Sequence, residues 1–525
     1  MQLSTNSDKL SLYRAIIFSL FKGQQVAAYN PCATQVLMVK GTGMNLSEYV
    51  KYDATGLASL LKTRQVTSDE LIRLAREAHD DVNPHVNAVL EFYEDAETVP
   101  GADTGFFQGV PFLRKDDGPT EAGRLQERGS RLFQGYRAPT ESIFFDLARN
   151  AGLRTVGRTA VPEFGAGGEA VSFLHGITRN PWNLDRSAGG SSGGAAAAVA
   201  AGITPIAHGG DGAGSIRGPA AWGGHVGLLP SRGRISGDNR DTSVTRNFVH
   251  CRTVRDMAAA LDAFSCPQPG DEFIIVQPAR PYLEELSQHT GALRVGVART
   301  TWGWIPVEPE ILEVVDSTAS LLEEMGHQVT EIKPPFDFDE FIRIDFLVHD
   351  LGVASSLEAE ARAMGRTIGP DTLEPINLKY YERGKRVLAD GERVMSMSRE
   401  LQDARRQMKL QVGKAIDAFD ILLTPTYSIV PQPHGGTWAL TDTTLSLEEW
   451  VRRSYKGGFL PIFNTTGQPA VSLPLGESSQ GLPIGIQIVG RFGDESTLVR
   501  VARDLEEARP WKERRPKIRA GDSRP

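Results

Sequence analysis

The chain has 525 residues, of which 40% are hydrophobic and 23% charged, and its formal net charge is −8 at neutral pH. This composition excludes wholesale disorder, and the acidic balance argues against a general nucleic-acid binder or a protein of anionic membrane surfaces. Three cysteines are too few for a disulfide framework, and no Cys-x-x-Cys or histidine-rich cluster indicates a metal site. The 54 glycines are more than the typical ~7% share, so their placement is informative.

The N-terminal region carries no clear targeting or membrane signal. Its apolar run at 15–21 is far shorter than the ~20 residues of a membrane span, and no small-x-small cleavage site follows it. We predict that residues 1–43 are an N-terminal extension of a single catalytic domain at 44–525. A cytoplasmic protein without a membrane or nucleic-acid partner is the expectation.

From Met44 onward, helix and strand patterns alternate along the chain. The segment 67–77 opens with the capping-box pattern Thr-x-x-Glu, and 83–93 reads either as a short strand or as a helical turn. Further predicted helices lie at 45–61, 141–151, 310–325 and through most of 340–414. Predicted strands lie at 153–157, 293–297 and 329–332. The segment 415–423 is predicted to hold one more helix or strand. This alternation favours an α/β fold with a central sheet.

Two glycine-serine turns, joined by a helix of small residues at 193–201 and a short strand at 203–207, occupy 187–227. A flexible linker would not explain the small-residue helix. A phosphate loop is excluded because no lysine follows either turn, and Ser215 stands where a dinucleotide fingerprint requires its last glycine. Gly-x-Ser-x-Gly around Ser191 matches a hydrolase nucleophile elbow, but 183–188 is too polar for the buried strand that should precede it. A Ser-His-Asp hydrolase using Ser191 therefore stays a minor alternative.

Taken together, these motifs resemble the amidase-signature family of serine hydrolases. The resemblance covers roughly 44–516, and within the family it is nearest to the bacterial amidases that include the cyclic nylon-oligomer (6-aminohexanoate cyclic dimer) hydrolases. The matching motifs stand, in the family's order, at 109–116, 157–159, 162–164, 180–183, 189–194, 211–220, 227–235, 422–426, 464–469 and 481–487. The resemblance implies a large mixed, twisted sheet with helices on both faces.

By this resemblance Ser215 is the nucleophile, Ser191 is a bridging serine whose preceding peptide bond is usually cis, and Lys115 is the base. The chemistry has an independent physical rationale. A serine hydroxyl is a weak nucleophile until a positioned base removes its proton. A lysine with its ordinary pKa of ~10.4 is charged at neutral pH, so Lys115 must be buried to act as that base. The apolar residues at 110–113 favour such burial.

The resemblance assigns supporting roles around these three residues. The backbone N–H groups of the turn Gly212, Ala213, Gly214 and Ser215 are expected to form the oxyanion hole. Asp116, Asp211 and Arg217 are expected to be structural supports of the site. Candidate substrate-binding residues are Gly189, Gly190, Tyr427 and Phe463, with Trp304 as a further aromatic candidate for the wall.

The predicted function is hydrolysis of an amide, aryl amide, carbamate (urethane) or oligoamide through an acyl-enzyme, with no metal or cofactor. The partner is a small-molecule amide, and a homodimer is the default expectation for an enzyme of this size. One alternative is the amidase-type subunit of a tRNA-dependent amidotransferase, and the Ser-His-Asp hydrolase is the other.

Overall fold

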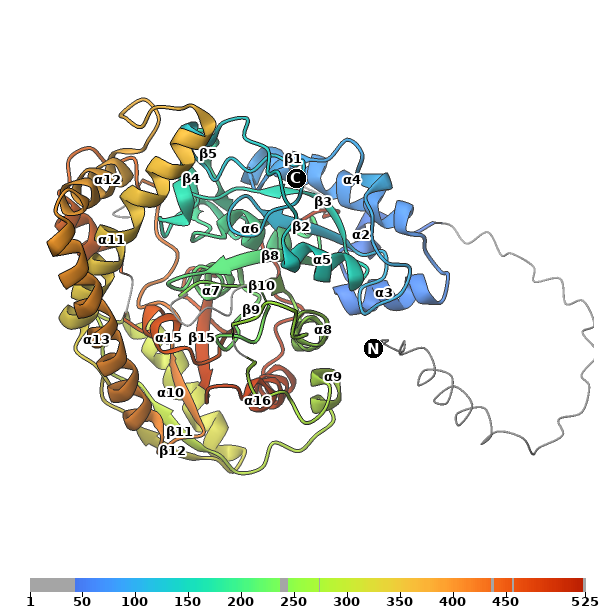
Figure 1. The fold of residues 1–525 in the computed structure, drawn as a ribbon. Helices are drawn as coiled ribbons and strands as arrows, with labels where there is room; N and C mark the ends of the chain where they lie inside the picture. The colour runs from blue at the N-terminus through green and yellow to red at the C-terminus, as the bar shows by residue number, and fades with distance from the viewer. Residues whose placement is uncertain (1–42, 237–243, 273, 436–438, 456–457, 523–525) are drawn as a thin grey trace, which may run out of the picture. The chain divides into compact units, whose positions relative to one another are not determined.

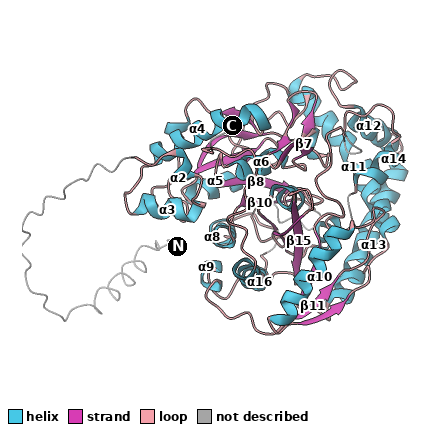
Figure 2. Ribbon diagram, turned by 180° about the vertical axis from the view of Figure 1, so that it is seen from behind, coloured by secondary structure: helices cyan, strands magenta, loops and turns pink. Residues whose placement is uncertain are grey.

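An eleven-stranded mixed sheet, flanked by helices, forms the centre of the computed structural model (Figures 1 and 2). The structure describes residues 43–236, 244–272, 274–435, 439–455 and 458–522. Residues Met44–Pro525 cluster into one compact unit. The predicted extension at 1–43 lies almost wholly outside the described residues and stays a prediction. None of the helices in the described ranges is both long and apolar enough to cross a membrane.

The strands of the main sheet follow the order β1-β3-β2-β8-β10-β9-β14-β15-β13-β11-β12. Strand β2, the third in this order, lies between two parallel neighbours, β3 and β8. From β8 to β13, each neighbouring pair of strands is antiparallel. Their bounds are β1 Val89–Phe92, β2 Pro111–Lys115, β3 Arg154–Thr159, β8 Ile206–Asp211, β9 Val226–Leu229, β10 Arg246–Cys251, β11 Arg294–Val297, β12 Gln328–Glu331, β13 Ile421–Pro425, β14 Ala470–Glu477 and β15 Pro483–Gly490. The mixed, helix-flanked sheet confirms the predicted fold class.

Helices of very different length cover this sheet. The α-helices are α2 Leu46–Tyr49, α3 Ala54–Lys62, α4 Ser68–Val86, α5 Ile143–Asn150, α6 Gly193–Ala201, α7 Arg217–Gly223, α8 Val254–Phe264, α9 Tyr282–Glu285, α10 Pro309–Glu324, α11 Phe338–Met364, α12 Pro375–Leu388, α13 Gly391–Ile416, α14 Leu447–Ser454, α15 Pro461–Thr466 and α16 Glu495–Ala508. Short 3-10 turns lie at Ala96–Thr98, Arg131–Phe133 and Glu163–Gly165.

Several predicted elements differ in their bounds. The helix expected at 45–61 is two helices, because Asp53 caps the start of α3 by accepting from the Gly56 N–H. Helix α4 continues well past 77, and although Thr67 accepts from the Glu70 N–H, the reciprocal half of a capping box is not present there. The stretch 83–93, which could have been a strand or a helical turn, contains strand β1 at its end. The strand expected at 203–207 begins only at Ile206. The segment 415–423 holds the end of α13 and most of β13.

The polar segment before the first glycine turn forms a strand, β7 (Asn183–Ser187), which pairs with β6 (Arg179–Asn180) in a separate two-stranded ribbon. Most of its residues are partly exposed, because their side chains are polar. It is therefore not the buried sheet strand that a nucleophile elbow requires.

Helix α6 packs closely because its residues are small. All of its residues except Ala200 are buried, and it contacts β8, β2 and β10. A Cβ added to Gly194 would lie 2.4 Å from the Ala160 backbone nitrogen, so only glycine permits this approach. The close packing places the start of α6, and with it the loop containing Ser191, against the end of β2.

Candidate active site

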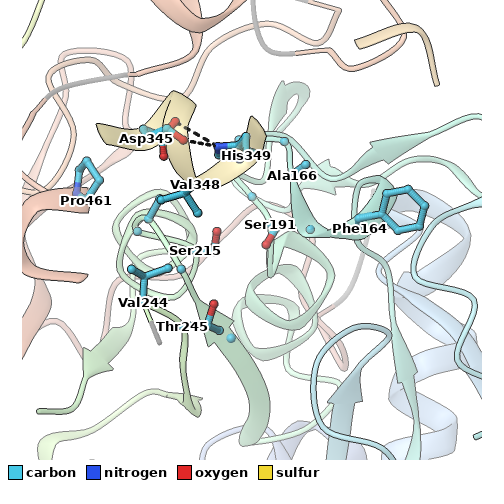
Figure 3. A pocket seen from close by; sticks show the side chains of 18 of the residues that line it. Phe164, Ala166, Ser191, Ser215, Val244, Thr245, Asp345, Val348, His349 and Pro461 are labelled. Carbon is cyan, nitrogen blue, oxygen red and sulfur yellow. Dashed lines mark hydrogen bonds and ion pairs between the residues drawn. The ribbon is translucent and has the colours of Figure 1, made fainter. Parts of the chain in front are cut away.

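Three predicted residues reach one cavity from three different elements. Lys115 is the last residue of β2, Ser191 lies in the loop before α6, and Ser215 lies in the turn between β8 and α7. The cavity has a volume of about 540 Å³, and all three residues line it. Figure 3 shows the Ser191 and Ser215 side chains from its interior. The sequence separates Lys115 from Ser215 by 100 positions, so the parallel pairing of β2 with β8 is what brings them together.

Lys115 and Ser191 are in direct contact. The lysine Nζ lies 2.7 Å from Ser191 Oγ and donates to the Gly210 carbonyl at 3.1 Å. The peptide bond between Gly190 and Ser191 is cis. Burial lowers the pKa of Lys115 to about 8, although the charges of Asp117 and Asp211 act in the opposite direction. A substantial fraction of Lys115 is therefore neutral slightly above neutral pH, as a base must be.

The Asp211 carboxylate holds the turn that carries Ser215 by accepting hydrogen bonds from its backbone. Asp211 Oδ1 accepts from the Gly214 N–H at 2.7 Å, and Oδ2 accepts from the Ile216 N–H at 3.2 Å. The Gly214 N–H is therefore directed at the carboxylate. The N–H groups of Gly212, Ala213 and Ser215 have no hydrogen-bond partner among the described residues, and all three residues line the cavity. These three are the donors best placed for an oxyanion.

Asp211 itself belongs to a buried ion pair with Arg217. Arg217 Nε lies 2.9 Å from Asp211 Oδ2, and both side chains are fully buried. The same guanidinium donates to Asn464 Oδ1 at 2.6 Å and to Gln487 Oε1 at 2.7 Å. Burial would raise the pKa of Asp211, but Arg217, Asn464 and the Gly214 N–H outweigh it and lower the pKa. The network connects the Ser215 turn to α15 and β15.

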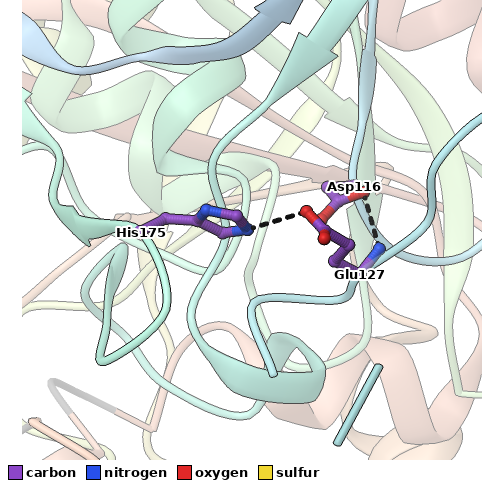
Figure 4. A group of neighbouring side chains, drawn as sticks. All are labelled: Asp116, Glu127 and His175. Atoms are coloured by element: carbon purple, nitrogen blue, oxygen red, sulfur yellow. Dashed lines mark hydrogen bonds and ion pairs between the residues drawn. The ribbon is translucent and has the colours of Figure 1, made fainter. Parts of the chain in front are cut away.

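Asp116 points away from the cavity into a polar cluster with Glu127 and His175 (Figure 4). The ligand atoms of these three residues lie within 4.8 Å of one another. Arg158 is bound in the same place, 3.1 Å from Asp116 Oδ2 and 2.7 Å from Glu127 Oε2. Because the Arg158 guanidinium pairs with both carboxylates, the cluster is suited to hold β2 and β3 in place.

The roof of the cavity comes largely from α11, with α12 and α14 beside it. Of the predicted substrate-binding residues, Gly190 and Tyr427 line the cavity. Gly189 packs against Pro219, and Phe463 is fully buried beside Trp302, so neither belongs to the lining, and neither does Trp304. Sequence reasoning missed the lining residues Asp117, Thr245, Asn247, Asp345 and His349. Only Asp117 had a local signal, since it follows Lys115 by two positions.

The histidines near the two glycine-serine turns lie outside the contacts of Ser191 and Ser215. His208 Nδ1 accepts from the Lys115 backbone N–H at 3.2 Å, and its Nε2 lies 3.2 Å from Asn247 Oδ1. His225 Nε2 lies 2.9 Å from His250 Nδ1. Burial lowers the pKa of His208 to about 3 and that of His225 to about 4, so both are neutral supports of β8 and β10. None of these three contacts Ser191 or Ser215.

Asp117 offers a direct test of how the lysine is tuned. A Cβ added to Gly165 would lie 2.7 Å from Asp117 Oδ2 and 3.2 Å from Ser191 Oγ, so the carboxylate lies close to Ser191. Since its charge raises the pKa of Lys115, wild-type kcat/KM should rise with pH through a midpoint near 8, and Asp117→Asn should move that midpoint to lower pH. A pH–rate profile measures both. An unchanged midpoint in Asp117→Asn would contradict the expected coupling.

Comparisons with known proteins identify the family of the chain. The family model described as amidase matches residues 69–499. The 6-aminohexanoate-cyclic-dimer hydrolase of Paenarthrobacter ureafaciens is 35% identical over 484 residues, covering 89% of this chain and 96% of that protein. A solved 6-aminohexanoate cyclic dimer hydrolase complexed with substrate matches with a TM-score of 0.82 at 33% identity, over 89% of this chain and 99% of the other. A bacterial aryl acylamidase of the amidase-signature family matches with a TM-score of 0.77 at 25% identity, over 90% and 99%.

The fold and these relatives define a hydrolase of carbon–nitrogen bonds other than peptide bonds. The family match spans most of the described chain, and the relatives are matched over nearly their whole length. The chain belongs to the amidase family. The resemblance seen in the sequence motifs is thus confirmed.

Proposed function

We propose that this amidase acts through an acyl-enzyme on Ser215, with Ser191 and Lys115 as a proton relay. The observation that carries the proposal is the 2.7 Å contact between Lys115 Nζ and Ser191 Oγ in a site where the lysine pKa falls to about 8. Ser215 Oγ attacks the amide carbonyl carbon and passes its proton to Ser191, which gives its own proton to Lys115. The N–H groups of Gly212, Ala213 and Ser215 stabilise the oxyanion.

The second half of the cycle uses the same groups in reverse. Ser191 protonates the leaving nitrogen and recovers a proton from Lys115 as the C–N bond breaks, which leaves the acyl group on Ser215. Water then attacks the ester carbonyl, and its proton follows the same path to Lys115. The products are a carboxylic acid and an amine, and Ser215 regains its proton. Asp116, Asp211 and Arg217 position these groups without contacting substrate.

The substrate is a small-molecule amide. The cavity roof is rich in aliphatic and aromatic side chains, among them Phe341, Ile344, Val348 and Leu357. This lining favours a substrate with an apolar body, such as an aliphatic or aryl amide or a short oligoamide. The names of the relatives, a cyclic-dimer hydrolase and an aryl acylamidase, point to the same range. Side-by-side hydrolysis of amides, anilides, carbamates and oligoamides tests this range.

The role of Ser215 is tested by covalent labelling. An activated fluorophosphonate should react once per chain, with the Ser215 oxygen bonded to phosphorus and fluoride released, because only the nucleophile is activated for attack. Mass spectrometry of the digested protein locates the adduct. Ser215→Ala should lose labelling completely, whereas Ser192→Ala, a neighbouring serine outside the cavity lining, should keep it. An adduct on Ser191 would reverse the proposed roles.

The alternatives receive less support. An amidotransferase subunit would show no hydrolysis by the purified chain alone. A Ser-His-Asp site on Ser191 would need a histidine at its Oγ, where the lysine stands instead. A homodimer and a cytoplasmic location remain predictions from the sequence.

A further inference from the structure

Among the described residues, the Asp345 carboxylate in the roof of the cavity forms no ion pair with an arginine or a lysine. Asp345 and His349, one turn apart on α11, both line the cavity, and Figure 3 shows them on the side facing Ser215. The Asp345 side chain is 20% exposed. Within the described chain its one ion-pair partner is His349, with 3.5 Å between Nδ1 and Oδ2. Such a carboxylate presents a negative charge to whatever fills the cavity.

The His349 ring is oriented by Asp345. His349 Nδ1 lies 2.8 Å from the Asp345 backbone carbonyl, which only accepts hydrogen bonds, so Nδ1 must carry a proton. The other ring nitrogen, Nε2, has no partner among the described residues. The Asp345 carboxylate only accepts hydrogen bonds, so a ligand group that binds it must be a donor.

Aromatic rings surround this pair. The His349 ring stacks on Tyr380 with centroids 4.7 Å apart, and Tyr380 meets Trp450 edge to face at 6.3 Å. Phe341 and Tyr455 form a second edge-to-face pair at 6.1 Å. All four aromatic residues line the cavity. Burial and the nearby Asp345 charge raise the pKa of Tyr455 and of Tyr380, so both phenols stay neutral.

The other carboxylates that line the cavity in the described chain, Asp117 and Glu360, already have an arginine partner. Arg128 lies 3.0 Å from Asp117 and 3.1 Å from Glu360. Arg405 lines the cavity from α13. A carboxylate with aromatic rings around it is the combination that recognises an organic cation, through charge and cation–π attraction.

We propose that Asp345, His349 and the surrounding aromatic rings form a subsite for a protonated alkylamine group of the substrate. The inference rests on the proposed amidase function and refines its substrate class to amides that carry an ammonium group away from the scissile bond. The apolar residues between the roof and Ser215 then accommodate the alkyl chain that separates the ammonium group from the amide.

The test uses alkylammonium ions, which need no turnover to be detected. Isothermal titration calorimetry of the whole protein compares n-butylammonium through n-octylammonium chloride with the uncharged alcohols of the same length. At one chain length or more, the ammonium ion should bind the wild type at least ~10-fold more tightly than its alcohol, an effect between those of exposed and buried ion pairs. Asp345→Asn should remove that preference.

Asp339→Asn is the matched control, because Asp339 is an exposed carboxylate on the same helix and is not part of the cavity lining. It should keep both the ammonium preference and the basal hydrolysis of a neutral anilide. Equal binding of ammonium and alcohol to the wild type, or a preference that survives in Asp345→Asn, would overturn the inference. Hydrolysis of neutral anilides by the wild type would still support the amidase proposal if the ammonium preference is absent. If the wild type hydrolyses no amide at all, the amidase proposal is contradicted, whatever the binding measurements show.

Discussion

Replacement of Lys115 by methionine is expected to reduce kcat for amide hydrolysis by ~10²–10⁴-fold or more, the contribution of a general acid–base group. Methionine fills a similar volume but carries no proton-accepting nitrogen. Ser191 then has no group to receive its proton, because Nζ is the one basic atom of the described chain in contact with its hydroxyl. Steady-state hydrolysis of an anilide measures the effect.

Two further variants separate the base from the charge. Lys115→Arg keeps a positive charge, but a guanidinium does not lose its proton in proteins, so this variant should be as inactive as the methionine variant. Lys62→Met, an exposed lysine of α3, should retain full activity. Activity of Lys115→Met close to the wild type would contradict the relay and revive a histidine base.

The folded state should tolerate the loss of this lysine. Because its folded pKa of about 8 is below the ordinary value, the protonated side chain destabilises the fold at pH values below 8, and stability is regained as pH rises from there toward the unfolded pKa. Lys115→Met removes that penalty, so its thermal midpoint at neutral pH should equal or exceed that of the wild type. Loss of activity then cannot be attributed to unfolding.

The chemical centre could be predicted from the sequence because its signals are local. Lys115 follows an apolar stretch that becomes β2, and the two serines stand in glycine turns on either side of α6. Each motif specifies its own backbone geometry within a few residues. Their order along the chain matched a family pattern, which supplied the roles that no single motif could.

The walls of the cavity could not be predicted in the same way. Asp345 and His349 lie within a segment correctly expected to be helical, but their spacing of four residues shows only that they share a helix face. Which face meets the cavity depends on how α11 packs on α12 and α13, and that packing is long-range. Phe463 shows the converse error. It was predicted to contact the substrate, but an apolar side chain is equally suited to the core, and the structure places Phe463 there.

One element boundary depends on both local and long-range contacts. The continuous helix expected at 45–61 is interrupted where Asp53 caps α3 through the Gly56 N–H and also bonds to Arg255 and Thr253. The cap is local, but Arg255 and Thr253 are about two hundred positions away, and the pattern of apolar residues carries no trace of them. Tertiary contacts of this kind override local propensity.

Arg217→Ala is expected to lower the free energy of unfolding by about 3–5 kcal/mol, the cost of removing one partner of a buried ion pair. Asp211 would remain fully buried without its counter-charge, and Asn464 and Gln487 would lose the hydrogen bonds that Arg217 donates. Urea unfolding followed by circular dichroism measures the change. Arg73→Ala, which breaks an exposed pair with Glu77, should change stability by less than ~0.5 kcal/mol.

Arg217→Lys keeps this prediction testable if the alanine variant does not fold. A lysine retains the charge, but its single nitrogen carries three donors and cannot replace the five hydrogen bonds of the Arg217 guanidinium, so an intermediate loss of stability is expected. Because Asp211 also holds the Gly214 and Ile216 N–H groups, the Ser215 turn should loosen and kcat should fall together with stability. A lysine variant with wild-type stability and wild-type kcat would show that the network does not position the nucleophile. A loss of stability with unchanged kcat would confine Arg217 to folding, since the turn would then keep its geometry without the guanidinium.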